Sequence, residues 1–463
     1  MRRRSTSLPD TFCLAIVLAA GAMACASVSP TPDRDSTDAI SDGSDGASDS
    51  VSDVCSGECC SDDECRAADP AAVCARGRCE RCLPVVDGRY RMSYRSTDVG
   101  GATGSGITPS GPHESCAFRM FERAFAVIRG SGTRPTDLAV EPCWTFDSSG
   151  CYRWSGALSV PADVSIHSSR PTTAPYFERL YVIAVVSGEA GLVVEAPGVV
   201  LSDAYVDSQG LGPDVGVLVR GSPSPGPTFR DITILTGRSA GLDVRGSAHV
   251  MLGSILFGHR PIGNPLPTIG VRVSENATLV TERGADIDVS NPSILVTDRA
   301  RLVMRNSGNL ASCSGGPAIE IRSPGSAEGG SELIESCIQH LDVTSNARVR
   351  IRGSSIERMR ILPVGSGDRE DPSGIDLGRP GDPGLNEFHP RPLRPGFHEP
   401  GLCFAFPERA AAPVSAVGNL WPSVDCRTAT GTVSRVATCT GMPTGDIGVL
   451  NPGNMVDVSP CTF

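Results

Sequence analysis

The sequence predicts an all-β protein built as a right-handed parallel β-helix, a solenoid in which each coil of the chain stacks on the one before. Three observations predict this fold: a short apolar phrase recurs, its apolar positions alternate at period two, and alanine recurs at one place within it. The four clearest copies are LDVRGSAHVML from Leu242, VRVSENATLVT from Val271, ILVTDRARLVM from Ile294 and LDVTSNARVRI from Leu341.

Each copy has the pattern of two short strands that meet at a corner. Counted from the first residue, offsets 0, 2, 6, 8 and 10 are apolar except at Thr281. Alternation at period two is typical of strands that bury one face. Offset 6 is always a small residue, which a crowded corner explains. The residues at this offset are Ala248, Ala277, Ala300 and Ala347.

Looser copies begin at Leu192, Val217 and Ile319, so the starts lie about 22 to 29 residues apart, as in stacked structural repeats. Neither strand of a copy can bury its apolar face alone, which predicts parallel stacking of the coils at a spacing of about 4.8 Å. A β-sandwich is the alternative. It needs tight hairpin turns between its strands, and copies in one phase with a fixed corner fit that requirement poorly.

The first 26 residues have the parts of an export signal. Three arginines after Met1 precede an apolar run, Cys13–Gly21, that is too short to span a bilayer, and Ala22-Met23-Ala24 is a small-residue cleavage site. Cys25 resembles the lipidated cysteine of a bacterial lipoprotein, although Ala22-Met23 departs from the usual residues before it. Plain cleavage at this site would instead leave a secreted or periplasmic protein. We expect export, with a lipid anchor at Cys25 in the outer membrane or at the cell surface.

Residues 27–54 have almost no apolar content, so they cannot bury enough surface to fold and should form an extended, disordered acidic spacer. Only Arg34 opposes the acidic residues in and just after this stretch. These are Asp33, Asp35, Asp38, Asp42, Asp45, Asp49, Asp53, Glu58, Asp62, Asp63 and Glu64. No basic face is evident anywhere in the chain, so we expect no nucleic-acid partner.

Cysteine usage predicts disulfides in an oxidising compartment, because sixteen cysteines remain after Cys13 and Cys25 are set aside. Seven fall in a small module at residues 55–83, where Cys79 and Cys82 also allow zinc as the competing interpretation. In the body we expect Cys143 to pair with Cys151, and Cys313 with Cys337. The module holds Cys55, Cys59, Cys60, Cys65, Cys74, Cys79 and Cys82, and the rest of the chain adds Cys116, Cys403, Cys426, Cys439 and Cys461.

The rest of the chain divides into three parts. Residues 84–190 should form an N-terminal cap and the first coils, because Phe118, Phe121, Phe125 and Ile128 have helical spacing after Ser115, the predicted N-cap. Residues 191–400 should form the β-helix repeats. Residues 401–463 are rich in Gly and Pro and should form a C-terminal cap held by disulfides.

Two late segments carry a resemblance. GIDLGRPGDPGLNEF from Gly374 contains DLG followed by PG, Asn and Phe, and AVGNLW from Ala416 has a GN before an aromatic residue. With the CAF text at Cys116, these segments resemble a branch of uncharacterised bacterial surface proteins in the pectin-lyase-like β-helix superfamily. The resemblance covers about residues 84–463. It implies the fold and a surface location, and it implies no catalytic residue.

Enzymes of that superfamily that cleave acidic polysaccharides use carboxylates on neighbouring coils, with an arginine or lysine base in the lyases. At offset 1 of the repeat, the only carboxylates on consecutive coils are Glu320 and Asp342. The alternative is Asp207 with Asp231, 24 residues apart and hence expected one coil apart, with Arg220 and Arg245 aligned at offset 3 nearby. Turn residues exposed to solvent explain the same two aspartates.

The sequence therefore predicts an exported β-helix protein, tethered to the outer membrane, with a structural or surface-binding role. The alternative is a polysaccharide lyase or hydrolase with an unrecognised site. We expect a monomer with no cofactor and no metal, held to a membrane through a lipid anchor and binding a surface glycan or protein.

Overall fold

A computed structural model gives the fold of the chain. It describes residues 64–65, 67, 72–75, 78–81, 89–92, 118, 121–132, 135–143, 152–154, 157–185, 188–208, 212–221, 223–234, 237–253, 255–256, 269–282, 292–307, 317–326, 329–364, 370–379, 381–388, 392–394, 397–398, 402–405, 414–419, 432–433, 437–438, 442–443 and 456–457. The predicted signal, Cys25 and the acidic spacer lie outside these residues.

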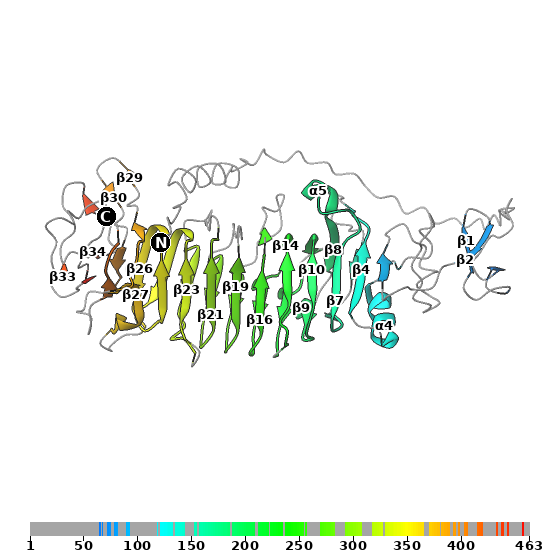
Figure 1. Cartoon of the computed structure of the whole chain (residues 1–463), viewed down its shortest axis with the longest axis horizontal. Coiled ribbons are helices and arrows are strands. Elements are labelled where there is room, and N and C mark those ends of the chain that lie inside the picture. Colours follow the sequence, from blue (N-terminus) through cyan, green and yellow to red (C-terminus); the bar gives the residue numbers. More distant parts are fainter. Residues whose placement is uncertain are drawn as a thin grey trace, which may run out of the picture.

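Most described strands belong to three parallel sheets that run along one elongated body (Figure 1). Sheet I contains β6 (Leu158–Ser159), β9 (Ala190–Val194), β12 (Val215–Val219), β15 (Ala240–Val244), β18 (Ile269–Val273), β20 (Ile294–Val296), β22 (Ile319–Ile321), β24 (Cys337–Thr344), β26 (Ser355–Leu362), β31 (Leu402–Phe404) and β34 (Ala437–Thr438), with β28 (Glu387–Phe388) paired to β26.

Sheet II contains β3 (Arg89–Met92), β4 (Thr136–Val140), β7 (Val164–Ser168), β10 (Val200–Ser202), β13 (Thr228–Arg230), β16 (His249–Leu252), β19 (Thr278–Glu282), β21 (Arg301–Arg305), β23 (Ser331–Ile334), β25 (Val349–Arg352), β27 (Ile375–Gly378), β32 (Val414–Ala416), β36 (Val456–Asp457) and, antiparallel at its edge, β33 (Thr432–Val433). Sheet III contains β5 (Tyr152–Trp154), β8 (Tyr181–Val185), β11 (Ala204–Ser208), β14 (Ile232–Ile234) and β17 (Ile255–Leu256).

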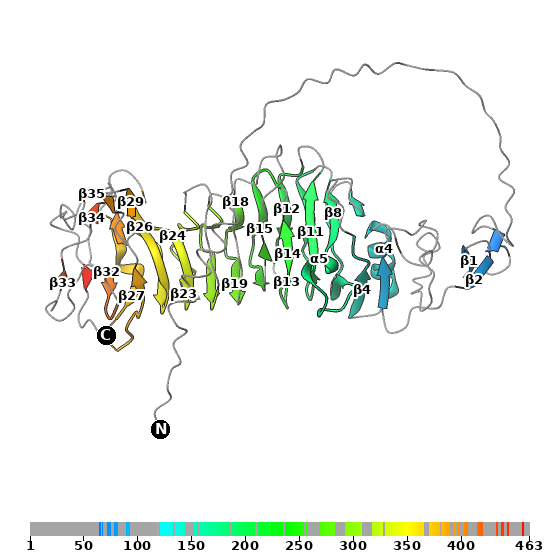
Figure 2. The ribbon, with the colours of Figure 1, turned by 90° about the horizontal axis from the view of Figure 1, so that it is seen from above.

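From β5 to β17 successive strands visit the three sheets in turn, and from β18 to β27 the described strands alternate between sheets I and II. This order of parallel strands is the topology of a parallel β-helix. The chain passes from β12 in sheet I to β13 in sheet II and β14 in sheet III, and β15 then pairs in parallel with β12. Figure 2, a view from above, shows the same stacking of coils along the body. The sheets therefore follow the repeat of the sequence, one coil for each copy of the phrase.

The register predicted by the phrase is confirmed. Leu192, Val217 and Leu242 stand opposite one another in β9, β12 and β15. The same column continues without a slip through the four remaining starts. These are Val271, Ile294, Ile319 and Leu341. A one-residue slip would turn every buried side chain outward, so the apolar pattern holds the coils in this register.

The two strands of each phrase meet at the first corner, between sheet I and sheet II. All four predicted corner alanines are fully buried. In three of the four copies, the residue two positions before the alanine has a positive φ angle, which is 75° at Gly246, 61° at Glu275 and 55° at Asp298. The carboxylate of Glu275 accepts from the Gly246 N–H at 2.8 Å, and that of Asp298 accepts from the Glu275 N–H at 3.0 Å. Stacked hydrogen bonds thus join this corner from one coil to the next.

One looser copy departs from the regular spacing. Ser326 and Gly329 form an antiparallel bridge within the coil that begins at Ile319, and this inserted turn delays the following strand. Gly330 lies between Arg301 and Arg348 in sheet II, and the three residues share one column. The inserted turn therefore does not shift the register of the following strands.

The N-terminal end of the stack is covered by helix α4 (Phe121–Ser131), as predicted. Phe121, Phe125 and Ile128 are buried in the same apolar core as the coils. The helix begins later than the sequence spacing suggests, because Phe118 forms a bridge with Met92 outside it. Ser115, the predicted N-cap, lies outside the described residues.

Smaller elements complete the fold. They are α5 (Tyr176–Arg179), the 3-10 helix η2 (Pro372–Gly374), and the antiparallel strands β1 (Ala72–Ala75), β2 (Arg78–Arg81), β29 (Pro392–Arg394), β30 (Phe397–His398) and β35 (Met442–Pro443). No helix within the described ranges has the length and apolar character needed to cross a membrane.

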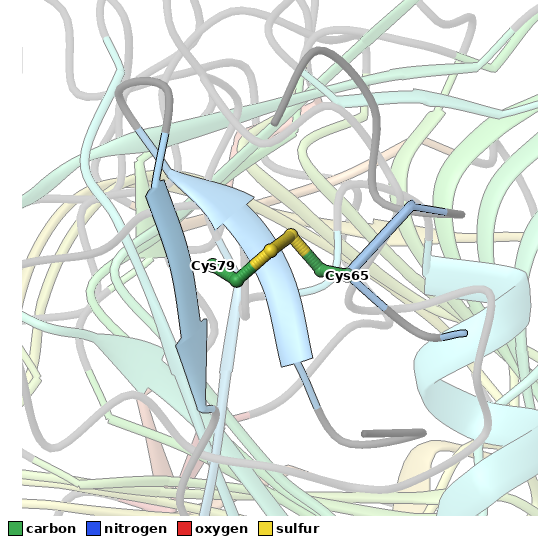
Figure 3. The surroundings of a disulfide bond; sticks show 2 residues. All are labelled: Cys65 and Cys79. Atoms are coloured by element: carbon green, nitrogen blue, oxygen red, sulfur yellow. A yellow bond between two sulfur atoms is a disulfide. The ribbon is translucent and has the colours of Figure 1, made fainter. Parts of the chain in front are cut away.

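The described residues include disulfide-bonded cysteines. In the module, Cys65 is bonded to Cys79 beside the β1–β2 pair (Figure 3). The sulfur of Cys79 is therefore not available as the thiolate that zinc would need. Cys143, Cys337 and Cys403 are also disulfide-bonded. The expected partners Cys151 and Cys313 lie outside the described residues, so those pairings stay predictions.

Candidate functional site

The structure does not bring Asp207 and Asp231 into one column. Tyr205 pairs with Thr233 in sheet III, so Asp231 stacks beside Asp203, and Asp207 lies four residues farther along, opposite Ala184. The prediction of a one-coil pair was wrong because this coil is longer than the 24 residues that separate the two aspartates.

The predicted alignment of Arg220 with Arg245 is confirmed, since Val219 and Val244 immediately before them are paired. These arginines lie at the first corner, whereas Asp231 lies at the second corner, between sheet II and sheet III. Arg220 pairs with Glu195, and the Arg245 guanidinium lies 2.6 Å from the Asp243 carboxylate. The four residues proposed from the sequence therefore do not form a single site.

A different cluster occupies the second corner. Asp203 and Asp231 are single residues between strands, with φ angles of 59° and 49°, and they stack one above the other. The insertion between β7 and β8 carries α5 and places Arg179 against both carboxylates. Arg179 donates to Asp203, and its other terminal nitrogen lies 3.5 Å from Asp231. The arginine thus neutralises two carboxylates that stacking would otherwise leave in repulsion.

The surroundings of this corner shift the pKa of Asp203. Burial raises the pKa of Asp203, and the charge of Asp231 raises it further, while Arg179 acts in the opposite direction. Nearby, a hydrogen bond of 2.6 Å to Asp137 raises the pKa of His167. The side chain of Asp203 is only 6 % exposed, so a substrate cannot reach this carboxyl without movement of Arg179.

The second group of charges lies on the outward side of sheet I. Glu320 and Asp342 stand opposite one another in β22 and β24, as the shared offset predicts. Both are buried beneath basic side chains. Arg322 lies 2.6 Å from Glu320, and Arg360 donates two hydrogen bonds to Asp342. His340, two residues earlier in β24, lies 3.0 Å from Asp342.

These contacts keep Asp342 ionised. Burial alone raises the pKa of this carboxyl, but hydrogen bonds from His340 and Arg360 outweigh burial and bring the pKa below its usual value. A general acid needs the reverse, a carboxyl that holds its proton near neutral pH. Asp342 in this state is suited to binding basic side chains rather than to donating a proton.

The same outward column contains Asp243, whose side chain is fully buried. It accepts hydrogen bonds from Arg245 at 2.6 Å and from Arg272, one coil away, at 3.3 Å. Asp243, Glu320 and Asp342 are thus each paired with arginine. Among the residues that the structure describes, no three His, Cys, Asp or Glu side chains are grouped so that they could hold a metal ion.

The two late segments of the sequence, GIDLGRPGDPGLNEF and AVGNLW, contribute a ladder of buried asparagine amides. Asn386 and Asn419 are 0 % and 1 % exposed. The Asn386 side chain accepts from the Ser354 N–H at 3.0 Å and donates to the carbonyls of Ile351 and Leu377 at 3.1 Å. The Asn419 side chain repeats this pattern, because it accepts from the Asn386 N–H at 3.0 Å. Both asparagines satisfy backbone groups inside the stack.

The other signature residues support the same ladder. Asp376 binds Arg352 at 2.9 Å, and Asp382 binds that arginine at 2.6 Å. A Cβ atom at Gly378 would lie 2.1 Å from the Val417 carbonyl oxygen, and one at Gly384 would lie 1.8 Å from that of Leu377. These glycines allow close approach of the backbone. The described residues of these late segments therefore have a structural explanation.

Sequence reasoning missed Arg179 and Arg352, the two most deeply buried arginines of these clusters. Arg179 lies in an insertion that carries no copy of the phrase. For Arg352 a signal was present, since it follows the apolar positions of the copy at Leu341 and precedes an acidic signature by about one coil. No protein-family model, curated protein or solved structure matches this chain.

The ladder predicts a large loss of stability when Asn386 is replaced by leucine. The substitution leaves the Ser354 N–H buried without its partner and removes one of the donors to each of the Ile351 and Leu377 carbonyls, which should lower the free energy of unfolding by about 2 kcal/mol. Chemical denaturation followed by circular dichroism measures the change. The matched control is Leu385→Asn at the exposed neighbour, where φ is 52° and Asn is tolerated. Equal stability of the two variants would contradict the ladder.

The Asp342 cluster predicts a pH-dependent contribution to stability. Because the folded pKa of Asp342 is below its usual value of 3.8, the stabilisation is present above that value and is lost as pH falls through the folded pKa. Asp342→Asn should therefore lower the denaturation midpoint at pH 7 and have a smaller effect near pH 3. Glu335→Gln, at an exposed corner, is the control. An Asp342→Asn effect that is the same at both pH values would contradict this assignment.

Proposed function

We propose that the chain is an exported β-helix protein of the bacterial surface, tethered to the outer membrane through Cys25, with a structural or surface-binding role. The observation that supports the proposal is that carboxylates of the described coils are buried in ion pairs with arginine. Asp203 and Asp342 are buried against arginines of a neighbouring coil, and Glu320 is buried against Arg322 of its own coil. Such pairs stabilise a rigid rod and leave its outer surface for contact with a partner.

The architecture supports the finer assignment to right-handed, pectin-lyase-like β-helices. Parallel strands joined by crossovers are right-handed in nearly all known cases, because the twist of the strands favours that hand. The DLG…PG…N…F text also occupies the positions that join the last coils. Both arguments concern the fold and leave the partner to be found by experiment.

The tether follows from the order of segments in the sequence. An export signal, a cysteine at the cleavage site and an acidic spacer precede the rod, and this order would place a rigid body away from the membrane. Fourteen strands in sheet II correspond to a length of roughly 60 Å at the spacing of adjacent strands. A lipid anchor would present this length at the cell surface.

Cell fractionation tests the tether. The unmodified chain should sediment with the outer membrane, Cys25→Ala should move it to the soluble fraction, and intact mass should show an acylated N-terminus only in the former. Cys13→Ala, within the apolar part of the signal, is the matched control and should fractionate like the unmodified chain. A soluble, unacylated wild-type protein would refute the lipid anchor and leave a secreted or periplasmic protein.

A polysaccharide lyase or hydrolase is the second candidate, and one observation favours it. Glu320 and Asp342 stand on adjacent coils on the outward side of sheet I, with His340 beside them. Cleavage of an acidic polysaccharide would need a pair of this kind, once its arginines had moved.

Incubation with acidic polysaccharides tests this candidate. We expect no release of reducing ends and no unsaturated product, because the arginines hold both carboxylates in ion pairs. Cleavage that disappears in Glu320→Gln, but persists in the exposed control Glu335→Gln, would establish the enzyme and refute the non-enzymatic role.

A further inference from the structure

The insertion between β7 and β8 is bound to neighbouring coils at both of its ends. We call residues 169–180, which include α5, the α5 insertion, and Figure 1 shows it standing out from the row of strands. At its end, Arg179 binds Asp203 of the following coil. At its start, the Ser169 N–H donates to the Val140 carbonyl of the preceding coil at 2.7 Å. The insertion can therefore open only if contacts at these ends break.

His167 lies just before the start of the insertion, and both of its ring nitrogens face oxygen acceptors. Nε2 lies 2.6 Å from the Asp137 carboxylate of the preceding coil, and Nδ1 lies 2.7 Å from the Ser168 carbonyl oxygen. A neutral imidazole has a single N–H, so it would donate to one of these oxygens and turn a lone pair toward the other. Only the imidazolium can donate to both. The closed insertion thus requires a protonated ring.

The charges around His167 favour that proton. Asp137 lies in β4 and Asp203 at the corner after β10, while the positive charge of Arg179 in α5 is shared between Asp203 and Asp231. The hydrogen bond to Asp137 raises the pKa of His167, burial lowers it, and the charge of Asp203 raises it further. The outcome is a pKa above the ordinary value of histidine.

The ring is also open to the solution. Its side chain is 35 % exposed, so protons can exchange with solvent without unfolding of the coil. Its neighbours in the stack, Ala139 in β4 and Ser202 in β10, carry no charge. The protonation state of His167 can therefore follow the pH outside the protein.

We propose that His167 is a proton-operated latch for the α5 insertion. Its imidazolium form joins the Ser168 carbonyl to Asp137, and this contact fixes the start of the insertion and keeps Arg179 against Asp203. Loss of the proton breaks one of the two hydrogen bonds and releases the insertion from the second corner. The pH around the rod then decides which surface this corner presents. The latch belongs to the folded coils and does not depend on the tether at Cys25.

The direction of the pH dependence follows from proton binding to the closed form. Because the folded pKa of His167 is above its usual value of 6.5, the stabilisation is fully present below pH 6.5 and is lost as pH rises through the folded pKa. Burial raises the pKa of Asp203 as well, so ionisation of this carboxyl also favours opening. Rising pH therefore opens the corner and exposes Asp203.

Hydrogen–deuterium exchange of the full chain tests the latch. The reporter amides are those of Ser169, Arg170, Ala174 and Glu178, whose N–H groups donate hydrogen bonds in the closed insertion. After correction for the intrinsic exchange rate, their protection should fall about three- to tenfold between about pH 6 and about pH 9, the scale of one lost hydrogen bond. The amides of β12 and β15, in the buried stack, should keep their protection.

His167→Gln removes the titrating group and keeps a single donor. Protection of the reporter amides should then be low throughout and independent of pH. His249→Gln, at an exposed histidine of β16, is the matched control and should keep the pH dependence of the unmodified chain. Circular dichroism of both variants confirms that they are folded.

A titration of isotope-labelled histidines by NMR tests the latch without a substitution at His167. His167 should titrate above pH 6.5, and Asp137→Asn should lower its pKa. Three results would overturn the proposal: reporter amides whose protection does not vary with pH in the unmodified chain, a pH dependence that survives in His167→Gln, or a pKa of His167 that is unchanged by Asp137→Asn.

Discussion

The structure depends on one constraint, the parallel pairing of each coil with the next at a single register. Pairing sets every side chain above the residue at the same offset, about 4.8 Å away. This arrangement stabilises apolar columns, because their side chains stack and are buried together, as in the column from Leu192 to Leu341. A charged column does not gain, because like charges would stack. Each charge must therefore find a counter-charge from outside its own column or from a neighbouring position.

Arginine meets that requirement throughout the described coils. Its long side chain reaches one coil away, as Arg272 reaches Asp243, or across a corner, as Arg179 reaches Asp203. Its several donors let Arg352 bind two carboxylates and a backbone carbonyl at once. The chain contains no lysine, whose compact ammonium group makes fewer directed hydrogen bonds. Arginine therefore supplies every side-chain cation of the chain apart from histidine.

The sequence was sufficient to predict the coils, because period-two alternation and the alanine corners depend on local packing. The register of seven copies, the stacking of Glu320 on Asp342 and the alignment of Arg220 with Arg245 all follow from offsets alone. Offsets could not place Asp207 and Asp231, since that coil is longer than their spacing. They also could not reveal which arginine covers which carboxylate, because such contacts join different offsets and depend on insertions such as the one that carries α5.

The second corner shows how the chain can accept an insertion without loss of strand pairing. A single left-handed residue, Asp203 or Asp231, joins sheet II to sheet III in two coils, whereas residues 169–180 fill the same corner in the coil before them. The strands on either side of this insertion keep their pairing with neighbouring coils. Corner length and strand register are thus independent of each other. Insertions acquired at a corner during evolution can therefore add new surface without altering the stacked coils.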